Sequence, residues 1–274
     1  MDKPKRSAFI ISDGTGITAE SFGHSLLTQF PSVEFATEVL TFVDTAERAE
    51  KAVVQIKKAA KATGAKPIVF ATLVNEDLRA KVAAADCVFY DLFETYLQPL
   101  EEELGTRSSH KVGVSHGIVN HGGYASRIGA MNFALETDDG MSIESYKGAQ
   151  IVILGVSRSG KTPTCIYLAL QYGIYAANYP LTDSELDAGK LPEALVPFRE
   201  KLFGLTIDPY RLQQIRQERY NRDSYASSRQ CQYEIAQAEA IYRKARIKFL
   251  NSTQMSVEEL GAKIMQETGM KRQY

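Results

Sequence analysis

One eight-residue segment limits the folds open to this 274-residue chain more than any other feature. Residues 155–162 read GVSRSGKT and match the phosphate-binding loop pattern G-x-x-x-x-G-K-S/T at every position. A largely apolar run at 150–154 predicts a strand before this segment, and the pattern at 161–172 predicts a helix after it. A phosphate-binding loop needs that strand and that helix. The sequence therefore predicts a P-loop nucleotide-binding region.

The chemistry expected of this loop follows from its residue types. Glycines let successive backbone N–H groups turn inward around phosphate oxygens, and the helix N-terminus adds the positive end of its dipole. We expect Lys161 to reach the terminal phosphates, Thr162 to hold Mg²⁺ as a metal ligand, and Arg158 to add charge near the transferred phosphoryl group. The predicted nucleotide-binding residues are Gly155, Val156, Ser157, Arg158, Ser159, Gly160, Lys161 and Thr162.

A carboxylate partner for the loop is expected at the end of a neighbouring strand. The predicted strand at 202–207 leads into Asp208, which would coordinate the metal or orient a reactant there. We therefore predict Lys161, Arg158 and Asp208 as catalytic residues. Because Pro209 follows it, Asp208 is also well placed to cap the next helix, and the sequence leaves both interpretations open.

Apolar runs alternate with helical patterns along the chain, which is typical of βαβ units and a mainly parallel sheet. We predict an α/β fold with an N-terminal α/β domain at 1–145 and a C-terminal P-loop kinase-like domain at 146–274. Residues 106–123 show neither pattern and are expected to form a surface connection between the two regions. The predicted strands span 8–11, 39–43, 67–74, 87–90, 150–154, 175–178, 202–207 and 247–250.

Capping residues mark the expected ends of several helices. We expect helices to begin after Asp44, Asn75 and Ser256, the last with a capping box, and Gly64 to end the first of them. The Arg-rich stretch at 209–244 is expected to form one long helix.

A second glycine-rich loop lies near the start of the chain, where residues 12–19 read SDGTGITA. Gly14, Gly16 and Ala19 satisfy the weak dinucleotide pattern G-x-G-x-x-G/A, which by itself would indicate an oxidoreductase. Asp13 argues against that role because its carboxylate would repel a pyrophosphate. The loop is interpreted as part of a substrate or metal site facing the nucleotide, with a simple strand-to-helix turn as the open alternative.

Two further groups of polar residues have no settled role. Residues 116–140 carry side chains that could bind phosphate or metal, namely His116, His121, Arg127, Asp138 and Asp139. Their spacing fits no zinc pattern, and Asp138-Asp139-Gly140 is also a turn sequence. A run of arginines could recognise a phosphoprotein or nucleotide, or form a solvated helix face: Arg211, Arg216, Arg219, Arg222 and Arg229.

Composition narrows the classes of function. The net charge is −1, and residues 149–274 carry 17 Lys and Arg against 13 Asp and Glu, which suits an anionic ligand but not nucleic acid. No apolar run approaches the ~18–20 residues of a membrane span, and no export signal is present. Three widely spaced cysteines fit a reducing compartment. We expect a cytoplasmic protein with no membrane partner. Its assembly state stays open, a homo-oligomer included.

Several motifs together resemble one family. They lie at 11–20, 124–140, 155–164, 177–180, 201–209, 225–227, 251–253 and 256–259. Through these motifs the chain is similar over almost its whole length to the bifunctional kinase/pyrophosphorylase family, whose members regulate phosphoenolpyruvate synthase or pyruvate, phosphate dikinase. It is most similar to the synthase branch.

The resemblance implies two opposed activities. In one, an ADP-dependent serine/threonine kinase phosphorylates a threonine of phosphoenolpyruvate synthase and inactivates it, with Mg²⁺ as a cofactor. In the other, inorganic phosphate removes the phosphoryl group, releases pyrophosphate and restores activity. The chain contains no His-Arg-Asp catalytic loop and no Asp-Phe-Gly motif, so a kinase of this kind must use the phosphate-binding loop. Alternatives are the same chemistry on the dikinase, or a nucleotide-sensing module without chemistry.

Overall fold

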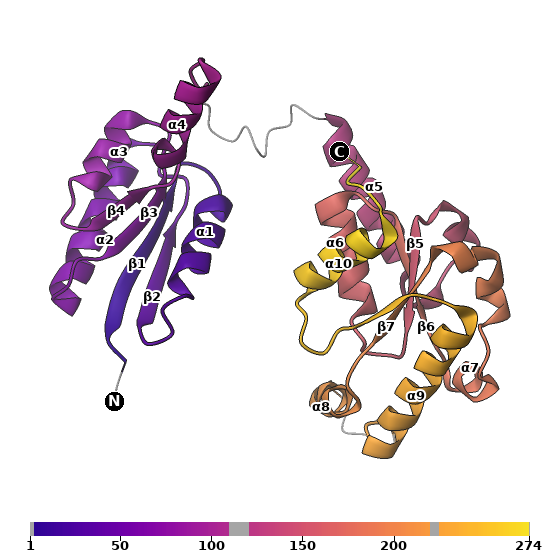
Figure 1. Cartoon of the computed structure of the whole chain (residues 1–274). Coiled ribbons are helices and arrows are strands. Elements are labelled where there is room, and N and C mark those ends of the chain that lie inside the picture. Colours follow the sequence, from indigo (N-terminus) through magenta and orange to yellow (C-terminus); the bar gives the residue numbers. More distant parts are fainter. Residues whose placement is uncertain (1–2, 110–120, 220–224, 274) are drawn as a thin grey trace. The chain divides into compact units, whose positions relative to one another are not determined.

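The computed structural model describes residues 3–109, 121–219 and 225–273, with only the backbone described for 121–124 and 219. The chain divides into two compact units, residues 1–117 and 118–274. Each contains a four-stranded sheet whose neighbouring strands are all parallel, so the predicted α/β class is confirmed (Figure 1). Among the described helices, none combines the length and the apolar character needed to span a membrane.

The N-terminal unit has the strand order β2-β1-β3-β4. Its strands are β1 (Lys5–Ser12), β2 (Glu34–Leu40), β3 (Ile68–Thr72) and β4 (Val88–Asp91). Its helices are α1 (Ile17–Leu27), α2 (Ala46–Thr63), α3 (Glu76–Ala83) and α4 (Glu94–Leu104). Side chains of β1 alternate between the two faces of the sheet: Phe9 and Ile11 pack with residues of α2 and α3, and Ala8 and Ile10 pack with residues of α1.

The start of α2 differs from the prediction. Thr45, not Asp44, is the N-cap: the Thr45 hydroxyl accepts a hydrogen bond from the Arg48 N–H group, while the Asp44 carboxylate pairs with the Arg48 guanidinium. The other expected caps are confirmed. Asn75 caps α3, and Gly64 ends α2 with a left-handed φ of 64°.

The C-terminal unit has the strand order β6-β5-β7-β8. Its strands are β5 (Ile151–Gly155), β6 (Ala176–Pro180), β7 (Leu202–Thr206) and β8 (Phe249–Asn251). Its α-helices are α5 (His121–Glu136), α6 (Lys161–Tyr172), α7 (Asp183–Ala188), α8 (Pro209–Arg219), α9 (Ser228–Ala245) and α10 (Val257–Thr268). Three 3₁₀ segments complete the described elements: η1 (Asp138–Gly140), η2 (Ile143–Gly148) and η3 (Glu193–Lys201).

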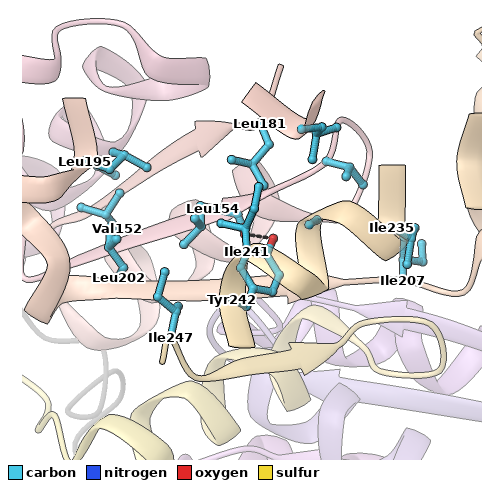
Figure 2. Packing of buried hydrophobic residues seen from close by; sticks show 14 of the residues in the cluster. Val152, Leu154, Leu181, Leu195, Leu202, Ile207, Ile235, Ile241, Tyr242 and Ile247 are labelled. Carbon is cyan, nitrogen blue, oxygen red and sulfur yellow. Dashed lines mark hydrogen bonds between the residues drawn. The ribbon is translucent and has the colours of Figure 1, made fainter. Parts of the chain in front are cut away.

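The central strand β5 is buried on both faces, which anchors the loop that follows it. Ile151 and Ile153 pack in the cluster formed with α5, α6 and α10, while Val152 and Leu154 pack in the cluster that includes α9 (Figure 2). Tyr242 of α9 lies in the second cluster, with its hydroxyl 3.2 Å from the carbonyl oxygens of Leu154 and Leu205. This buried contact links the carboxyl ends of β5 and β7.

Helix α5 was not predicted, because its glycines and polar residues resemble a loop. Small residues allow it to lie close to its neighbours: Ala130 and Ala134 share a buried cluster with α6, and Gly129 leaves room for the Tyr175 hydroxyl. The helix lies before the domain boundary predicted at 145, yet it packs within the second compact unit. Part of the connection expected at 106–123 lies outside the described residues.

The single long helix expected at 209–244 is wrong. Two helices, α8 and α9, occupy this stretch, and the Ser227 hydroxyl caps the second by accepting a hydrogen bond from the Gln230 N–H group. The capping box of Ser256 and Glu259 at the start of α10 is confirmed.

Strand β2 begins at Glu34, five residues before its predicted start. It is an edge strand with mostly exposed side chains, so its polar residues hide the apolar signal of a strand.

Candidate functional site

The loop at residues 155–162, hereafter the 155–162 loop, begins at the carboxyl end of β5. The chain passes from β5 to β6 on one side and later to β7 on the other, so the loop lies at the topological switch point of the sheet. In open α/β sheets, ligands bind outside the carboxyl ends of the strands at such a point. The fold therefore places the loop where a ligand site is expected.

Two glycines are required by the loop's conformation. A Cβ atom on Gly155 would lie 2.6 Å from Ser159 Oγ and 2.8 Å from the backbone oxygen of Leu205. Gly160 has a φ of 95°, which favours glycine, and it precedes α6 without any side-chain cap. The non-glycine residue Arg158 also has a positive φ, 76°. The first N–H groups of α6 are therefore not capped by the side chain before them, as an anion-binding helix start requires.

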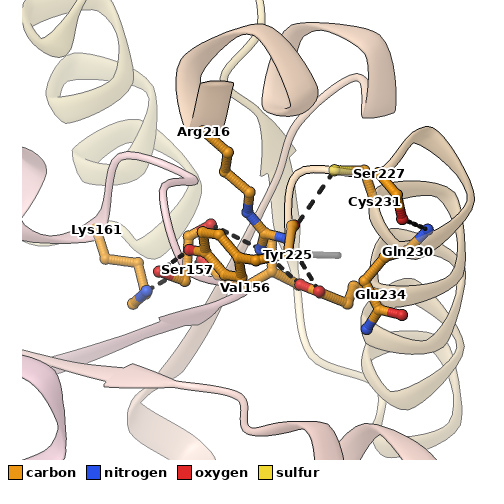
Figure 3. Close-up of polar contacts among 9 residues, drawn as sticks. All are labelled: Val156, Ser157, Lys161, Arg216, Tyr225, Ser227, Gln230, Cys231 and Glu234. Atoms are coloured by element: carbon orange, nitrogen blue, oxygen red, sulfur yellow. Dashed lines mark hydrogen bonds and ion pairs between the residues drawn. The ribbon is translucent and has the colours of Figure 1, made fainter. Parts of the chain in front are cut away.

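Lys161 is the buried cation of the loop. Its residue is 4% exposed, and Nζ donates a hydrogen bond of 3.1 Å to the Val156 carbonyl oxygen (Figure 3). Burial lowers the pKa of the Lys161 ammonium group to about 8, although the carboxylates of Asp139 and Asp138 act in the opposite direction. An ammonium group has three N–H donors, so it can also bind a phosphate oxygen. An arriving anion would stabilise the charge that burial disfavours.

Thr162 contacts the carboxylate of Asp138, which precedes β5 in the chain. Its hydroxyl donates a 2.8 Å hydrogen bond to Asp138 Oδ1, and the Asn178 amide of β6 donates to the same oxygen. The Asp139 N–H group in turn donates to Asn178 Oδ1 at 3.0 Å. The sequence left the role of Asp138 open between a site residue and a turn. The structure brings it to the loop.

The pair formed by Thr162 and Asp138 fits a magnesium ion. Hydroxyl and carboxylate oxygens are the hard donors that Mg²⁺ prefers, and Mg²⁺ usually takes only one or two protein carboxylates together with substrate phosphates. In the part of the chain that the structure describes, no group of three or more His, Cys, Asp or Glu forms a metal cluster. A metal at this position would take the rest of its ligands from phosphate oxygens and water.

Comparisons with known proteins identify the family. The family model described as kinase/pyrophosphorylase matches residues 8–265, which include the whole loop. The chain belongs to the kinase/pyrophosphorylase family. Similar members include provisionally assigned phosphoenolpyruvate synthase regulatory proteins from Hahella chejuensis, 54% identical over 98% of both chains, and from Alcanivorax borkumensis, 52% identical over 98% of both. Another, from Pseudomonas aeruginosa, is 50% identical, again over 98% of both chains.

Asp208, the predicted catalytic carboxylate, forms its hydrogen bonds at the start of α8 and with Thr253. Its Oδ1 atom accepts a 3.0 Å hydrogen bond from the Arg211 N–H group, which is the contact of a helix N-cap. Its own N–H group donates to the Thr253 hydroxyl at 2.7 Å. These contacts favour the capping interpretation that the sequence left open, and a catalytic role for Asp208 stays a prediction.

The second glycine-rich loop, residues 12–19, lies in the N-terminal unit at the carboxyl end of β1. Asp13 Oδ2 accepts a 2.7 Å hydrogen bond from the Val74 N–H group, so the carboxylate ties the loop after β1 to the residues after β3. Burial raises the pKa of the Asp13 carboxyl group, and the Val74 N–H group lowers it. Gly16 has a φ of 78° and precedes α1. These contacts describe a strand-to-helix turn, and a ligand role stays a prediction.

The remaining predicted site residues, the histidines and the other arginines, differ in whether they are described and in how exposed they are. His116 and Arg222 lie outside the described residues, as do the side chains of His121 and Arg219. Arg127 is half-buried on α5. Of the run of arginines, Arg211 and Arg229 are exposed, as a solvated face requires, whereas Arg216 is completely buried. Periodicity gave no signal that would separate Arg216 from the others.

Proposed function

We propose that this protein is a bifunctional regulator of phosphoenolpyruvate synthase. In one direction it phosphorylates a threonine of the synthase with ADP and inactivates it. In the other it removes that phosphoryl group with inorganic phosphate and releases pyrophosphate. The family and the names of its relatives support a kinase or pyrophosphorylase that acts in the regulation of the synthase. The observation that carries the proposal is the buried Lys161 beside the uncapped start of α6.

The N–H groups of the 155–162 loop and of the first turn of α6 would bind the terminal phosphate of ADP. Lys161 and Arg158 would stabilise the negative charge on the phosphoryl group as it moves. Thr162 and Asp138 would hold Mg²⁺, which neutralises charge on the phosphate oxygens when bound. Each of these groups acts by position and charge, as phosphoryl transfer requires.

The kinase reaction moves the β-phosphoryl group of ADP. The threonine oxygen forms a bond to the β-phosphorus, the bond from that phosphorus to the bridging oxygen breaks, and AMP leaves while the hydroxyl proton is released. In the reverse-direction activity an oxygen of inorganic phosphate forms a bond to the phosphothreonine phosphorus. The bond to the threonine oxygen breaks, that oxygen takes up a proton, and pyrophosphate leaves. The same cradle suits both reactions because each moves a phosphoryl group between two oxygens.

The test incubates the protein with β-labelled ADP, Mg²⁺ and either phosphoenolpyruvate synthase or pyruvate, phosphate dikinase, followed by mass spectrometry. We expect label on a threonine of the synthase, and release of labelled pyrophosphate after addition of inorganic phosphate. Lys161→Ala should abolish both reactions, while Lys263→Ala on α10 serves as the control. Label that stays on ADP with either target would overturn the proposed chemistry and favour a nucleotide sensor. Label on the dikinase alone would replace the target.

A further inference from the structure

A buried ion pair lies behind the 155–162 loop. Arg216 of α8 and Glu234 of α9 have side chains that are 0% and 6% exposed. Arg216 Nη1 donates to Glu234 Oε1 at 2.9 Å, and Nη2 donates to Oε2 at 2.6 Å, which gives a two-pronged contact (Figure 3). Removing two charges from water costs free energy that their attraction seldom exceeds, so this pair is not explained by stability alone.

The guanidinium group also holds two backbone oxygens. Nη2 donates to the Ser157 carbonyl of the loop at 3.2 Å, and Nη1 donates to the Tyr225 carbonyl at 3.1 Å. The two Nη groups of an arginine carry four N–H donors between them. Here the four donors have four oxygen acceptors, two on Glu234 and one each on Ser157 and Tyr225. A lysine at position 216 has three donors on one atom and could not reproduce this set.

Tyr225 adds a second contact to the same loop residue. Its ring lies under the guanidinium group, with Cζ of Arg216 4.1 Å from the ring centroid. Its hydroxyl donates to Ser157 Oγ at 2.9 Å. Ser157 is therefore held at both its carbonyl oxygen and its side chain. Figure 3 shows Arg216 and Tyr225 beside Ser157 of the loop.

We propose that Arg216 and Glu234 are positioning residues for the phosphate-binding loop, a role that rests on the proposed function. A loop that binds phosphate through its N–H groups must turn its carbonyl oxygens away, since an oxygen facing the ligand would repel it. The Arg216 guanidinium draws the Ser157 carbonyl outward. Glu234 fixes the plane of that guanidinium and balances its charge, so the pair holds the backbone without leaving an unpaired cation beneath the loop.

The test compares three variants with the wild type. The double variant Arg216→Met/Glu234→Met removes both charges together and keeps long apolar side chains, an exchange that is often neutral for stability. Arg216→Lys keeps the charge and loses the fork. Arg243→Met is the matched control, because Arg243 is an exposed arginine of α9 that pairs with the half-buried Glu239. The measurements are the unfolding midpoint, the Kd for ADP and for pyrophosphate with Mg²⁺, and kcat and KM for the kinase reaction.

We expect the double variant and Arg216→Lys to unfold within a few degrees of the wild type but to bind ADP and pyrophosphate at least ~10-fold more weakly, with a raised KM. The control should match the wild type. A double variant with wild-type affinity and kinetics overturns the positioning role, as does a lower unfolding midpoint with unchanged affinity. A wild-type protein that binds neither ligand overturns the proposed function itself, which keeps the two failures distinct.

If the double variant does not fold, Arg216→Lys decides the question, because it keeps the positive charge and loses the fork that reaches the Ser157 carbonyl. The probe is inorganic phosphate, titrated while the amide signals of Gly155 and Gly160 are followed by nuclear magnetic resonance. We expect these amides to respond at a several-fold higher phosphate concentration in Arg216→Lys than in the wild type. Identical titrations in the two proteins would overturn the inference.

Discussion

The Thr162 hydroxyl group donates a hydrogen bond of 2.8 Å to the carboxylate of Asp138, although the two residues are 24 positions apart in the chain. The Asn178 amide holds the same carboxylate oxygen. The carboxylate is thus fixed beside the first turn of α6, where the loop's cation and N–H groups also lie. This contact brings a carboxylate to the loop that the sequence had left open between a site residue and a turn, while a catalytic role for Asp208 stays a prediction.

Asp138→Asn should weaken the binding of the magnesium that the reaction needs. The substitution removes the negative charge while leaving one oxygen acceptor for Thr162. We expect the Mg²⁺ concentration for half-maximal kinase activity to rise about 10- to 100-fold, the range found when groups that support a metal are changed. Kinase assays across a Mg²⁺ titration measure this, with Asp183→Asn at the exposed start of α7 as the control. An activity loss with an unchanged Mg²⁺ midpoint would argue against a metal role.

Lys161 predicts opposite effects of pH on ligand binding and on stability. Its pKa in the folded protein, about 8, lies below the ordinary value of 10.5, and phosphate binding needs the charged form. ADP affinity should therefore fall as the pH rises above about 8. Calorimetric titrations at pH 7, 8 and 9 would show this. An ADP affinity that is constant over this range in the wild type would contradict the assigned role.

The stability of the ligand-free protein should rise with pH over the same range in which ADP affinity falls. Between pH 8 and 10.5 the unfolded chain keeps a proton on Lys161 that the folded chain has released, so this residue makes the protein more stable as the pH rises, by about 1 kcal/mol per pH unit. Below pH 8 both states hold the proton and this dependence disappears. Urea unfolding of the wild type and Lys161→Met at pH 7.5 and 9 gives the difference. Equal pH dependence in the two proteins would contradict the lowered pKa.

Gly155→Ala should distort the loop, although the substitution adds only one methyl group. The new Cβ atom would lie 2.8 Å from the Leu205 backbone oxygen, which cannot move without shifting β7. We expect a loss of about 1–3 kcal/mol in the free energy of unfolding and loss of ADP binding. Gly148→Ala is the control, since its Cβ atom would meet only Phe133 at an ordinary 3.5 Å. Equal stability and ADP affinity in both variants would show that the loop adopts another conformation.

Asp208 can be tested by two substitutions that separate its two interpretations. If it serves as the N-cap of α8, Asp208→Asn should keep stability and kcat near the wild-type values, and Asp208→Ala should lose about 1 kcal/mol of stability. Denaturant unfolding and kinase assays on both variants measure this. A fall in kcat of about 100-fold in Asp208→Asn, with stability retained, would instead establish the predicted catalytic role.

Much of the site was predictable because its signals are local. The loop pattern predicted the start of α6, and the capping box predicted the start of α10, since each depends on residues within one or two turns of the chain. Glycine at position 160 likewise follows from one left-handed backbone conformation. Such features need no knowledge of distant segments.

One element that sequence reasoning missed depends on distant contacts. Helix α5 has glycines that lower its intrinsic helix propensity, and Ala130 and Ala134 gain their stabilisation only by packing in the cluster with α6. Tertiary packing therefore overrides local propensity in α5. The separate start of α9 has instead a local signal, the Ser227 cap, inside a polar stretch whose periodicity looks continuous.

The sequence by itself determined that a loop capable of cradling phosphate follows a buried strand in an α/β protein of this family. Only the tertiary structure decided which residues support that loop. Asp138 reaches Thr162 because the segment that carries it ends beside β6, and Arg216 is buried because Glu234 of α9 faces it. An isolated charge gives no sign in the sequence of whether it will be solvated or paired, since its free energy depends on the partner that the fold brings within hydrogen-bonding distance.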